Sequence, residues 1–251
     1  MLPRLSLLLV LCFWPFATGH AATPELDQSL QCVVVLTDDW RSTSGVMRSF
    51  ERNGASENWT AHGPEIPVVV GKKGLGIGRG LARLKMGDAP VKAEGDDRAP
   101  AGIFRLSSVF GYAPARSANW VKLPYLPLSK TIEGVDDPNS HYYNKLVDRS
   151  RVRHVDWRSS ERMRRDDALY YKWGIVVDHN AAAIPGAGSC IFLHIWEGPA
   201  SPTSGCTAMA DRDLVELIRW LDPARRPILV QMPRATYRAV RARYNLPPDR
   251  S

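Results

Sequence analysis

One histidine and one cysteine in the last quarter of the chain have the spacing and the neighbouring residues expected of a reactive pair. His194 lies near the end of an apolar segment, and Cys206 follows it by twelve positions, directly after a glycine. A thiolate is a strong nucleophile, and an imidazole beside it can take its proton and later return it. A packed thiol and a structural histidine are the commoner explanation of such a pair, so the surrounding elements have to support the chemistry.

The segment 190–196 is predicted to be a strand that divides its side chains between two faces. Strand side chains alternate, so each face receives every second residue. The face we expect to pack in the core carries Ile191, Leu193 and Ile195. The face we expect to form the wall of a site carries Cys190, Phe192, His194 and Trp196.

The loop that leads to Cys206 is expected to expose the thiol where a strand and a loop meet a helix. There the backbone N–H groups of Gly205 and Cys206 could stabilise a developing oxyanion. A protonated His194 nearby would lower the pKa of the thiol from its usual value of about 8.5. These residue types therefore indicate acyl transfer through a cysteine.

The rest of the chain is predicted to be mostly β with a few short helices. We expect antiparallel strands in the first third. The expected strands cover 32–36, 46–50, 66–70, 103–109, 173–177 and 228–232, and 120–128 is expected to be an edge strand or loop because two prolines interrupt it. Asp211 is expected to cap a helix that buries Leu214, Leu217, Ile218 and Leu221 and ends before Pro223, and the basic segment 234–251 has room for a short helix.

Three segments suggest binding functions that their details do not support. The glycine-rich segment 71–80 lacks the Gly-Lys-Ser/Thr ending of a phosphate loop, so its glycines are expected to permit tight turns or close backbone approach. The segment 136–144 is expected to be a shaped surface loop. The seven arginines of 149–165 are expected on a solvated, partly helical surface. No nucleic-acid partner is expected, because no recognised binding motif accompanies the charge.

The first residues predict an exported protein. Arg4 precedes an apolar run that ends at Phe16, and small residues suit cleavage after Ala21 or Ala22. Residues 1–22 are therefore predicted to be a signal peptide and residues 23–251 a single catalytic domain, without stable membrane insertion after cleavage. Cleavage lowers the formal net charge of the 251-residue chain from +7 to +6, which suits an anionic polymer of the cell envelope as well as simple solubility.

The cysteines that remain after cleavage are Cys32, Cys190 and Cys206. Outside the cytoplasm, an odd number leaves at least one thiol unpaired or bound to another molecule. Cys190 is interpreted as a packing residue or as the disulfide partner of Cys32.

Other histidines are given structural interpretations. His179 is taken as a strand-end residue and not as a second base. His141 and His154 lie near Asp136 and Asp137 without the spacing of a metalloprotease, so no metal site is expected.

Four stretches, taken in order, resemble the L,D-transpeptidase (YkuD) catalytic domain, especially its envelope branch in Gram-negative bacteria. They are 95–106 (GDDRAPAGIFRL), 136–140 (DDPNS), 173–177 (WGIVV), and 193–196 (LHIW) followed by 202–206 (PTSGC). The resemblance runs from about Gly71 to the helix expected after Cys206, and so covers most of the chain after the predicted signal peptide.

The resemblance implies a β-sandwich or barrel with a few short helices, and a cysteine enzyme that acts on peptidoglycan stem peptides. It implies that Cys206 is the nucleophile and His194 the base and then the acid. The backbone carbonyl of Ser204 would orient the imidazole, and Gly205 with Cys206 would donate to the oxyanion. No metal or organic cofactor is implied, and carbapenems are expected to acylate the thiol. The candidate substrate-binding residues are Trp196, Thr203, Tyr142 and Tyr143, of which the three aromatic residues could equally well pack.

Two positions depart from the pattern of the family, Ser/Thr-His-Gly-Cys followed shortly by Arg or Asn. Ser204 replaces that histidine, and Ala208 stands where the Arg or Asn would be. The implied reaction is cleavage of the L,D bond before the terminal D-Ala of a tetrapeptide stem and transfer to an amine, which forms a 3→3 crosslink in the periplasm. The alternatives are an L,D-carboxypeptidase or related cysteine amide hydrolase, a non-catalytic cell-wall binding module, and, last, a zinc peptidase.

Overall fold

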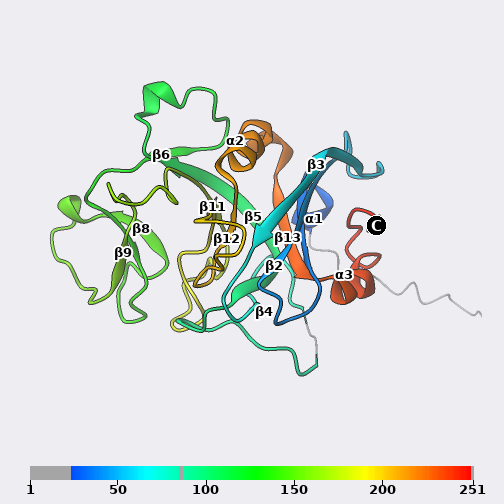
Figure 1. Cartoon of the computed structure of the whole chain (residues 1–251), viewed down its shortest axis with the longest axis horizontal. Coiled ribbons are helices and arrows are strands. Elements are labelled where there is room, and N and C mark those ends of the chain that lie inside the picture. The colour runs from blue at the N-terminus through cyan, green and yellow to red at the C-terminus, as the bar shows by residue number, and fades with distance from the viewer. Residues whose placement is uncertain (1–23, 85–86, 250–251) are drawn as a thin grey trace, which may run out of the picture.

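A computed structural model describes residues 24–84 and 87–249 of the chain (Figure 1). The predicted signal peptide, residues 1–22, lies outside the described residues. Within the described ranges, the helices are too short or too polar to cross a membrane.

The principal element of the fold is a mixed sheet of ten strands that closes on itself. Along the sheet the order is β10-β11-β12-β3-β2-β1-β13-β5, and β10 also pairs with β5, which completes a barrel. The predicted mostly β, barrel-like fold is confirmed. The strands are β1 (Gln31–Thr37), β2 (Ser44–Glu51), β3 (Thr60–Val69), β4 (Leu75–Ile77), β5 (Ala99–Gly111), β6 (Tyr125–Pro127), β10 (Trp173–Val177), β11 (Phe192–Ile195), β12 (Thr207–Met209) and β13 (Ile228–Pro233).

Two strands explain how the barrel is built. The β-branched run of β1 is buried along its whole length because β1 lies between β2, which is antiparallel to it, and β13, which is parallel. The antiparallel first third is thus as predicted. The long strand β5 pairs with β13 through residues 102–105 and with β10 through residues 106–111, and so links the two ends of the sheet. The proline-interrupted segment forms only the short edge strand β6, which pairs with β5.

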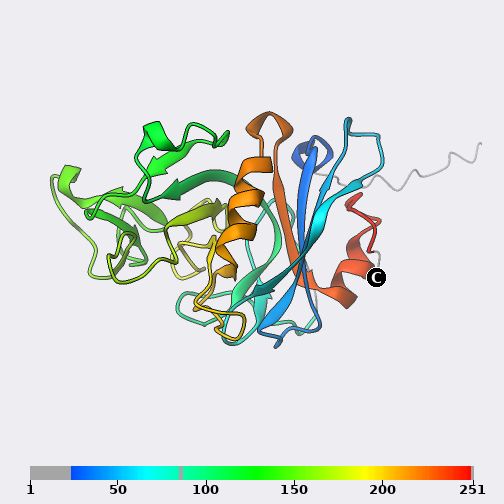
Figure 2. The ribbon, with the colours of Figure 1, turned by 45° about the horizontal axis from the view of Figure 1, so that its top comes forward.

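A second, three-stranded sheet forms a lobe beside the barrel, on the left in Figures 1 and 2. It consists of β7 (Ile132–Val135), β8 (Lys145–Asp148) and β9 (Ser160–Arg162). The prediction of a partly helical arginine-rich segment is wrong beyond one 3-10 turn, η2 (Arg149–Arg151). The reason is long-range: Glu133 of β7 accepts hydrogen bonds from Trp157 Nε1 (2.8 Å) and Ser160 Oγ (2.7 Å), which hold the segment against β7.

The helices are short. They are α1 (Pro24–Asp27), α2 (Asp211–Trp220) and α3 (Arg234–Val240), with 3-10 turns η1 (Ala115–Ser117) and η3 (Pro223–Arg225). The buried residues of α2 share the main hydrophobic core with the barrel strands. Helix α2 packs against β10 and β11 and lies across the barrel in Figure 2. Its predicted apolar residues Leu214, Leu217 and Ile218 are buried, as is Leu221 after its end.

The predicted cap of α2 is wrong by one position. The residue before the helix is Ala210, whose side chain offers no capping oxygen. Asp211 is the first helical residue, and its Oδ2 accepts from Lys172 Nζ at 2.7 Å. An acidic residue in the first turn still stabilises the helix dipole.

A glycine turn between β3 and β4 holds the loop that leads to Cys206. Gly71 bridges Thr203, the N–H of Lys72 donates to Thr203 O (2.8 Å), and the N–H of Thr203 donates to Val70 O (2.9 Å). A Cβ on Gly71 would overlap backbone atoms of residues 97–99, and one on Gly74 would overlap backbone atoms of residues 40 and 41. The predicted role of these glycines, tight turns and close backbone approach, is confirmed.

Replacement of Gly74 by alanine is expected to destabilise the protein by about 3 kcal/mol, because it combines a left-handed backbone with a backbone clash. Gly63→Ala is the matched control, since Gly63 has a similar positive φ but nothing within 4 Å of its added Cβ. That variant is expected to lose only about 1 kcal/mol. Chemical denaturation measures both, and equal losses would contradict the role assigned to close approach at Gly74.

Candidate active site

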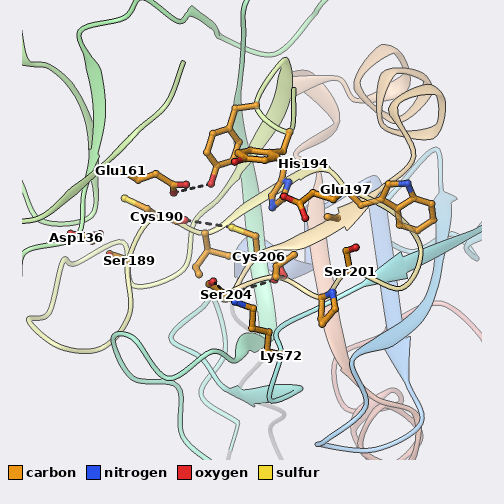
Figure 3. A pocket seen from close by; sticks show the side chains of 18 of the residues that line it. Lys72, Asp136, Glu161, Ser189, Cys190, His194, Glu197, Ser201, Ser204 and Cys206 are labelled. Atoms are coloured by element: carbon orange, nitrogen blue, oxygen red, sulfur yellow. Dashed lines mark hydrogen bonds between the residues drawn. The ribbon is translucent and has the colours of Figure 1, made fainter. Parts of the chain in front are cut away.

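The register of two parallel strands brings His194 and Cys206 to the same face of the sheet. Leu193 of β11 pairs with Thr207 of β12, and His194 pairs with Ala208. Cys206 immediately precedes β12, so it is the diagonal neighbour of His194 on one face. Both residues line a cavity of about 460 Å³, where Figure 3 shows them close together.

The two faces of β11 are largely as predicted. Ile191, Leu193 and Ile195 belong to the main hydrophobic core. On the other face, Cys190, His194 and Trp196 line the cavity. The prediction for Phe192 is wrong, because this side chain does not line the cavity. Its ring packs behind the cavity against the rings of Phe110 and Tyr171, whose centroids are 4.9 and 5.8 Å away.

Cys206 is more enclosed than expected. Only 9% of the residue is exposed, and a strand, not a helix, follows it directly. The N–H of Phe192 donates to its Sγ (3.3 Å), and its S–H donates to Cys190 O (3.7 Å). Burial raises the pKa of the Cys206 thiol to about 12, with the N–H of Phe192 opposing the shift. The expected lowering of this pKa by an adjacent imidazolium is therefore corrected.

His194 is held with one nitrogen turned to the backbone. Its Nδ1 lies 2.8 Å from Ile195 O, so we assign the ring proton to Nδ1, which leaves Nε2 with a free electron pair. The carbonyl that orients the ring is thus that of Ile195 and not, as expected, that of Ser204. Burial lowers the pKa of His194 to about 4, and Tyr171 packs edge-on against the ring.

These shifts place the pair in its neutral form at neutral pH. Cys206 is protonated below its raised pKa, and His194 is unprotonated above its lowered pKa. An imidazole in this state can accept a proton but has none to lose from Nε2. A neutral thiol and a neutral imidazole are suited to general-base activation during attack, and not to a preformed thiolate and imidazolium.

The loop before Cys206 is ordered by one hydroxyl group. Thr203 Oγ1 donates to Cys206 O (2.6 Å) and accepts from the N–H of Gly205 (3.2 Å). Gly205 was expected to donate to an oxyanion, but its N–H is already engaged by Thr203, which leaves the N–H of Cys206 as the candidate donor. Thr203 lines the cavity, as its proposed contact with substrate requires, yet its visible role is to position the loop. Ser204 is exposed, and its Oγ lies 3.5 Å from Lys72 Nζ.

Two of the three aromatic candidates lie outside the cavity. Tyr142 packs edge-on against Trp157, with ring centroids 5.4 Å apart. Tyr143 is buried and donates to Glu94 Oε2 at 2.5 Å. Tyr143 therefore contacts two residues that line the cavity, Glu94 and Ser189, without lining it itself. Of the three aromatic residues, only Trp196 is placed to contact a substrate directly.

The charged residues of the cavity come from segments that are far apart in the sequence. The cavity is lined by Lys72, Lys92, Glu94, Asp136, Glu161 and Glu197. Glu161 accepts from the hydroxyl of Tyr171 (2.8 Å), and burial together with the charge of Asp136 raises the pKa of Glu161. In Figure 3 these two acids lie on the side of Cys190, whereas Lys72 lies on the side of Ser204. The charged residues meet at the cavity through tertiary contacts, which the sequence does not reveal. The one local pattern is the four-residue spacing of Lys92 and Asp96, which form an ion pair.

Within the described residues, the other two cysteines, Cys32 and Cys190, are free thiols, as is Cys206. Cys32 lies in the core on β1, and Cys190 lines the cavity with its Sγ 3.7 Å from Val135 O. The alternative of a disulfide between Cys32 and Cys190 is therefore wrong, because the barrel places them on different elements and in different environments.

Two other histidines, His179 and His141, are held by neighbouring groups. His179 is buried; its Nδ1 accepts from the N–H of Arg79 (3.2 Å) and its Nε2 lies 2.9 Å from Ala187 O, which fits the predicted structural role. His141 Nδ1 lies 2.7 Å from Asp156 Oδ2. Over residues 24–84 and 87–249, no three His, Cys, Asp or Glu side chains are grouped as metal ligands would be.

Comparison with known proteins identifies one family. The family model of the L,D-transpeptidase catalytic domain, YkuD, matches residues 50–230, which include His194, Cys206 and most of the barrel. No curated protein and no solved structure matches the chain with significant similarity.

The pH dependence of thiol reactivity tests the neutral resting pair. Because the pKa of Cys206 is raised to about 12, the thiolate fraction should grow about tenfold per pH unit through the neutral range. We expect the logarithm of the rate of Cys206 alkylation by iodoacetamide to rise with a slope of about one between pH 6 and 9. Peptide mass spectrometry assigns the modified cysteine. A rate that levels off above pH 6 would show a preformed thiolate and contradict the neutral pair.

Proposed function

The chain belongs to the L,D-transpeptidase catalytic domain family, and we propose that it is a peptidoglycan L,D-transpeptidase that uses Cys206 as nucleophile and His194 as base. The observation that carries the proposal is the placement of both side chains on one face of β11 and β12, in one cavity. Family membership supplies the substrate, peptidoglycan, and the geometry supplies residues able to perform acyl transfer.

The proposed reaction has two halves. As Cys206 Sγ attacks the carbonyl of the third residue of a tetrapeptide stem, His194 Nε2 takes the thiol proton. The C–N bond to the terminal D-Ala breaks, His194 returns the proton to the departing amine, and a thioester remains. An amine of a second stem then attacks the thioester and releases the thiol, which yields a 3→3 crosslink. All proton transfers pass through His194, and the chemistry calls for no metal or organic cofactor.

The charges around the cavity support a peptide that carries both signs. Lys72, beside Ser204, can attract the carboxylate of the terminal D-Ala. Glu161 and Asp136, on the opposite side in Figure 3, can attract an ammonium group such as that of meso-diaminopimelate. Acceptor amines would then approach the thioester past the acidic side of the cavity.

The alternative within the same chemistry is hydrolysis. If water resolves the thioester, the protein is an L,D-carboxypeptidase or a related cysteine amide hydrolase. Ser204 and Ala208 replace the His and the Arg or Asn of the familiar motif, and both line the cavity. We therefore expect these two positions to affect whether an amine or water is the acceptor. A non-catalytic cell-wall binding module is the lesser alternative. We propose that the protein is exported to the periplasm of the cell envelope, because residues 1–22 have the pattern of a signal peptide.

Product analysis tests the proposed reaction. We expect purified protein with disaccharide-tetrapeptide to give dimers that lack one D-Ala, and Cys206→Ala to give none. The matched control is Cys32→Ala, which removes a thiol in the core on β1 and is expected to keep the activity. Mass spectrometry measures the products.

The other outcomes of this experiment separate the alternatives. Tripeptide monomers would indicate hydrolysis, and unchanged substrate with measurable binding would indicate a binding module. Dimers formed by Cys206→Ala would overturn the thiol mechanism.

The loop hydroxyl offers a second test. Thr203→Val removes both hydrogen bonds that order the loop, so the thiol and the N–H of Cys206 should lose their alignment with the substrate. We expect kcat to fall about tenfold to a hundredfold with little change in KM, whereas Thr203→Ser, which keeps the hydroxyl, should retain most of the activity. Steady-state kinetics decides, and a Thr203→Val enzyme as active as Thr203→Ser would remove the positioning role.

A further inference from the structure

Lys92 is a buried cation far upstream of Cys206 in the sequence. Its side chain is only 4% exposed, and its Nζ donates to Ala93 O (2.6 Å) and to Asp96 Oδ1 (2.5 Å). Burial of a charge is costly even when it is paired, and a surface lysine would hold the same turn at less cost. The position of this ammonium group therefore calls for a role besides stability.

The ion pair lies directly behind the loop that carries the nucleophile. A Cβ built on Gly205 would lie 3.8 Å from Lys92 Nζ, and Lys92 lines the same cavity as Cys206. Asp96 also accepts from the N–H groups of Ala93 (2.8 Å) and Arg98 (3.0 Å), so the carboxylate is fixed by the backbone. The ammonium is thus held in one place, and Lys72, which is exposed, is not held in this way.

The charges that face Cys206 oppose one another. Lys92 lowers and Glu161 raises the pKa of the thiol. The charged side chains that line the cavity are Lys72, Lys92, Glu94, Asp136, Glu161 and Glu197. The uncharged titratable side chains that line it are Cys190, His194, Tyr170 and Tyr171. Four acids against two lysines make a cavity that disfavours negative charge at the sulfur, so a fixed cation near Gly205 matters more than it would in water.

We propose that Lys92 is the electrostatic positioning residue of this site: its fixed ammonium stabilises the negative charge that develops at Cys206, first on sulfur and then on the oxyanion of the tetrahedral intermediate. The part of this proposal that concerns the oxyanion rests on the proposed function. Ser204 and Ala208 bring no charge at the positions where the familiar motif carries His and Arg or Asn. Lys92 supplies a cation from a different segment of the chain.

The test measures the reactivity of the thiol without any peptidoglycan. The rate of Cys206 alkylation by iodoacetamide is followed by peptide mass spectrometry between pH 6 and 9. For Lys92→Met we expect alkylation about tenfold slower at each pH, which corresponds to a thiol pKa about one unit higher. Lys92→Arg should restore most of the rate. Glu161→Gln should change the rate in the opposite direction and make alkylation faster.

Two further variants separate charge from structure. The double variant Lys92→Met with Asp96→Asn removes the ion pair as a neutral unit, so it is expected to fold and still to show the slow alkylation. Lys73→Met removes an exposed lysine that pairs with Asp97 outside the cavity, and its alkylation rate should equal that of the parent protein. If Lys92→Met does not fold, the double variant and Glu161→Gln decide. A folded double variant with an unchanged alkylation profile would overturn the proposal.

Turnover of disaccharide-tetrapeptide gives an independent readout. We expect Lys92→Met to lower kcat at least tenfold with KM nearly unchanged. A higher KM with unchanged kcat and unchanged alkylation would make Lys92 a contact for a substrate carboxylate and overturn its assigned role. Because alkylation requires no turnover, a protein that fails to act on peptidoglycan would refute the proposed function while the alkylation series still tests Lys92.

Discussion

The parallel pairing of β11 with β12 is the constraint on which the site depends. It fixes His194 and Cys206 as diagonal neighbours on one face, and a shift of one residue in either strand would turn one side chain into the core. Helix α2 packs behind β11, and Thr203 links the preceding loop to both the glycine turn and Cys206. The relative position of His194 and Cys206 is thus set by the pairing of two barrel strands.

The burial of Cys206 and His194 also favours the uncharged form of both side chains. Burial favours the thiol over the thiolate and the imidazole over the imidazolium, so at rest neither residue carries charge. In the proposed reaction, negative charge develops on the carbonyl oxygen as the thiol attacks. The groups that can offset that charge are the N–H of Cys206 and the ammonium of Lys92, and both lie beside Gly205.

The sequence predicts the features that depend on local periodicity. Alternation along β11 correctly separates Leu193 from His194, and the run of β1 correctly indicates a buried strand. Features that depend on distant pairing are missed. In the second sheet, Glu133 of β7 binds Trp157, 24 positions later in the chain, and no local pattern reveals this contact. The enclosure of Cys206 and the convergence of Lys92 and Glu161 on it likewise result from closure of the barrel, which joins segments that are far apart in the chain.

The proposed function requires that a stem peptide acylates Cys206. Intact-protein mass spectrometry after brief mixing with disaccharide-tetrapeptide tests it most directly, because the acyl-enzyme differs from the free protein by the mass of the substrate less D-Ala. We expect this adduct on the peptide that contains Cys206, formed together with free D-Ala and absent from Cys206→Ala. Release of D-Ala by the Cys206→Ala protein, or an adduct on any other residue, would contradict it.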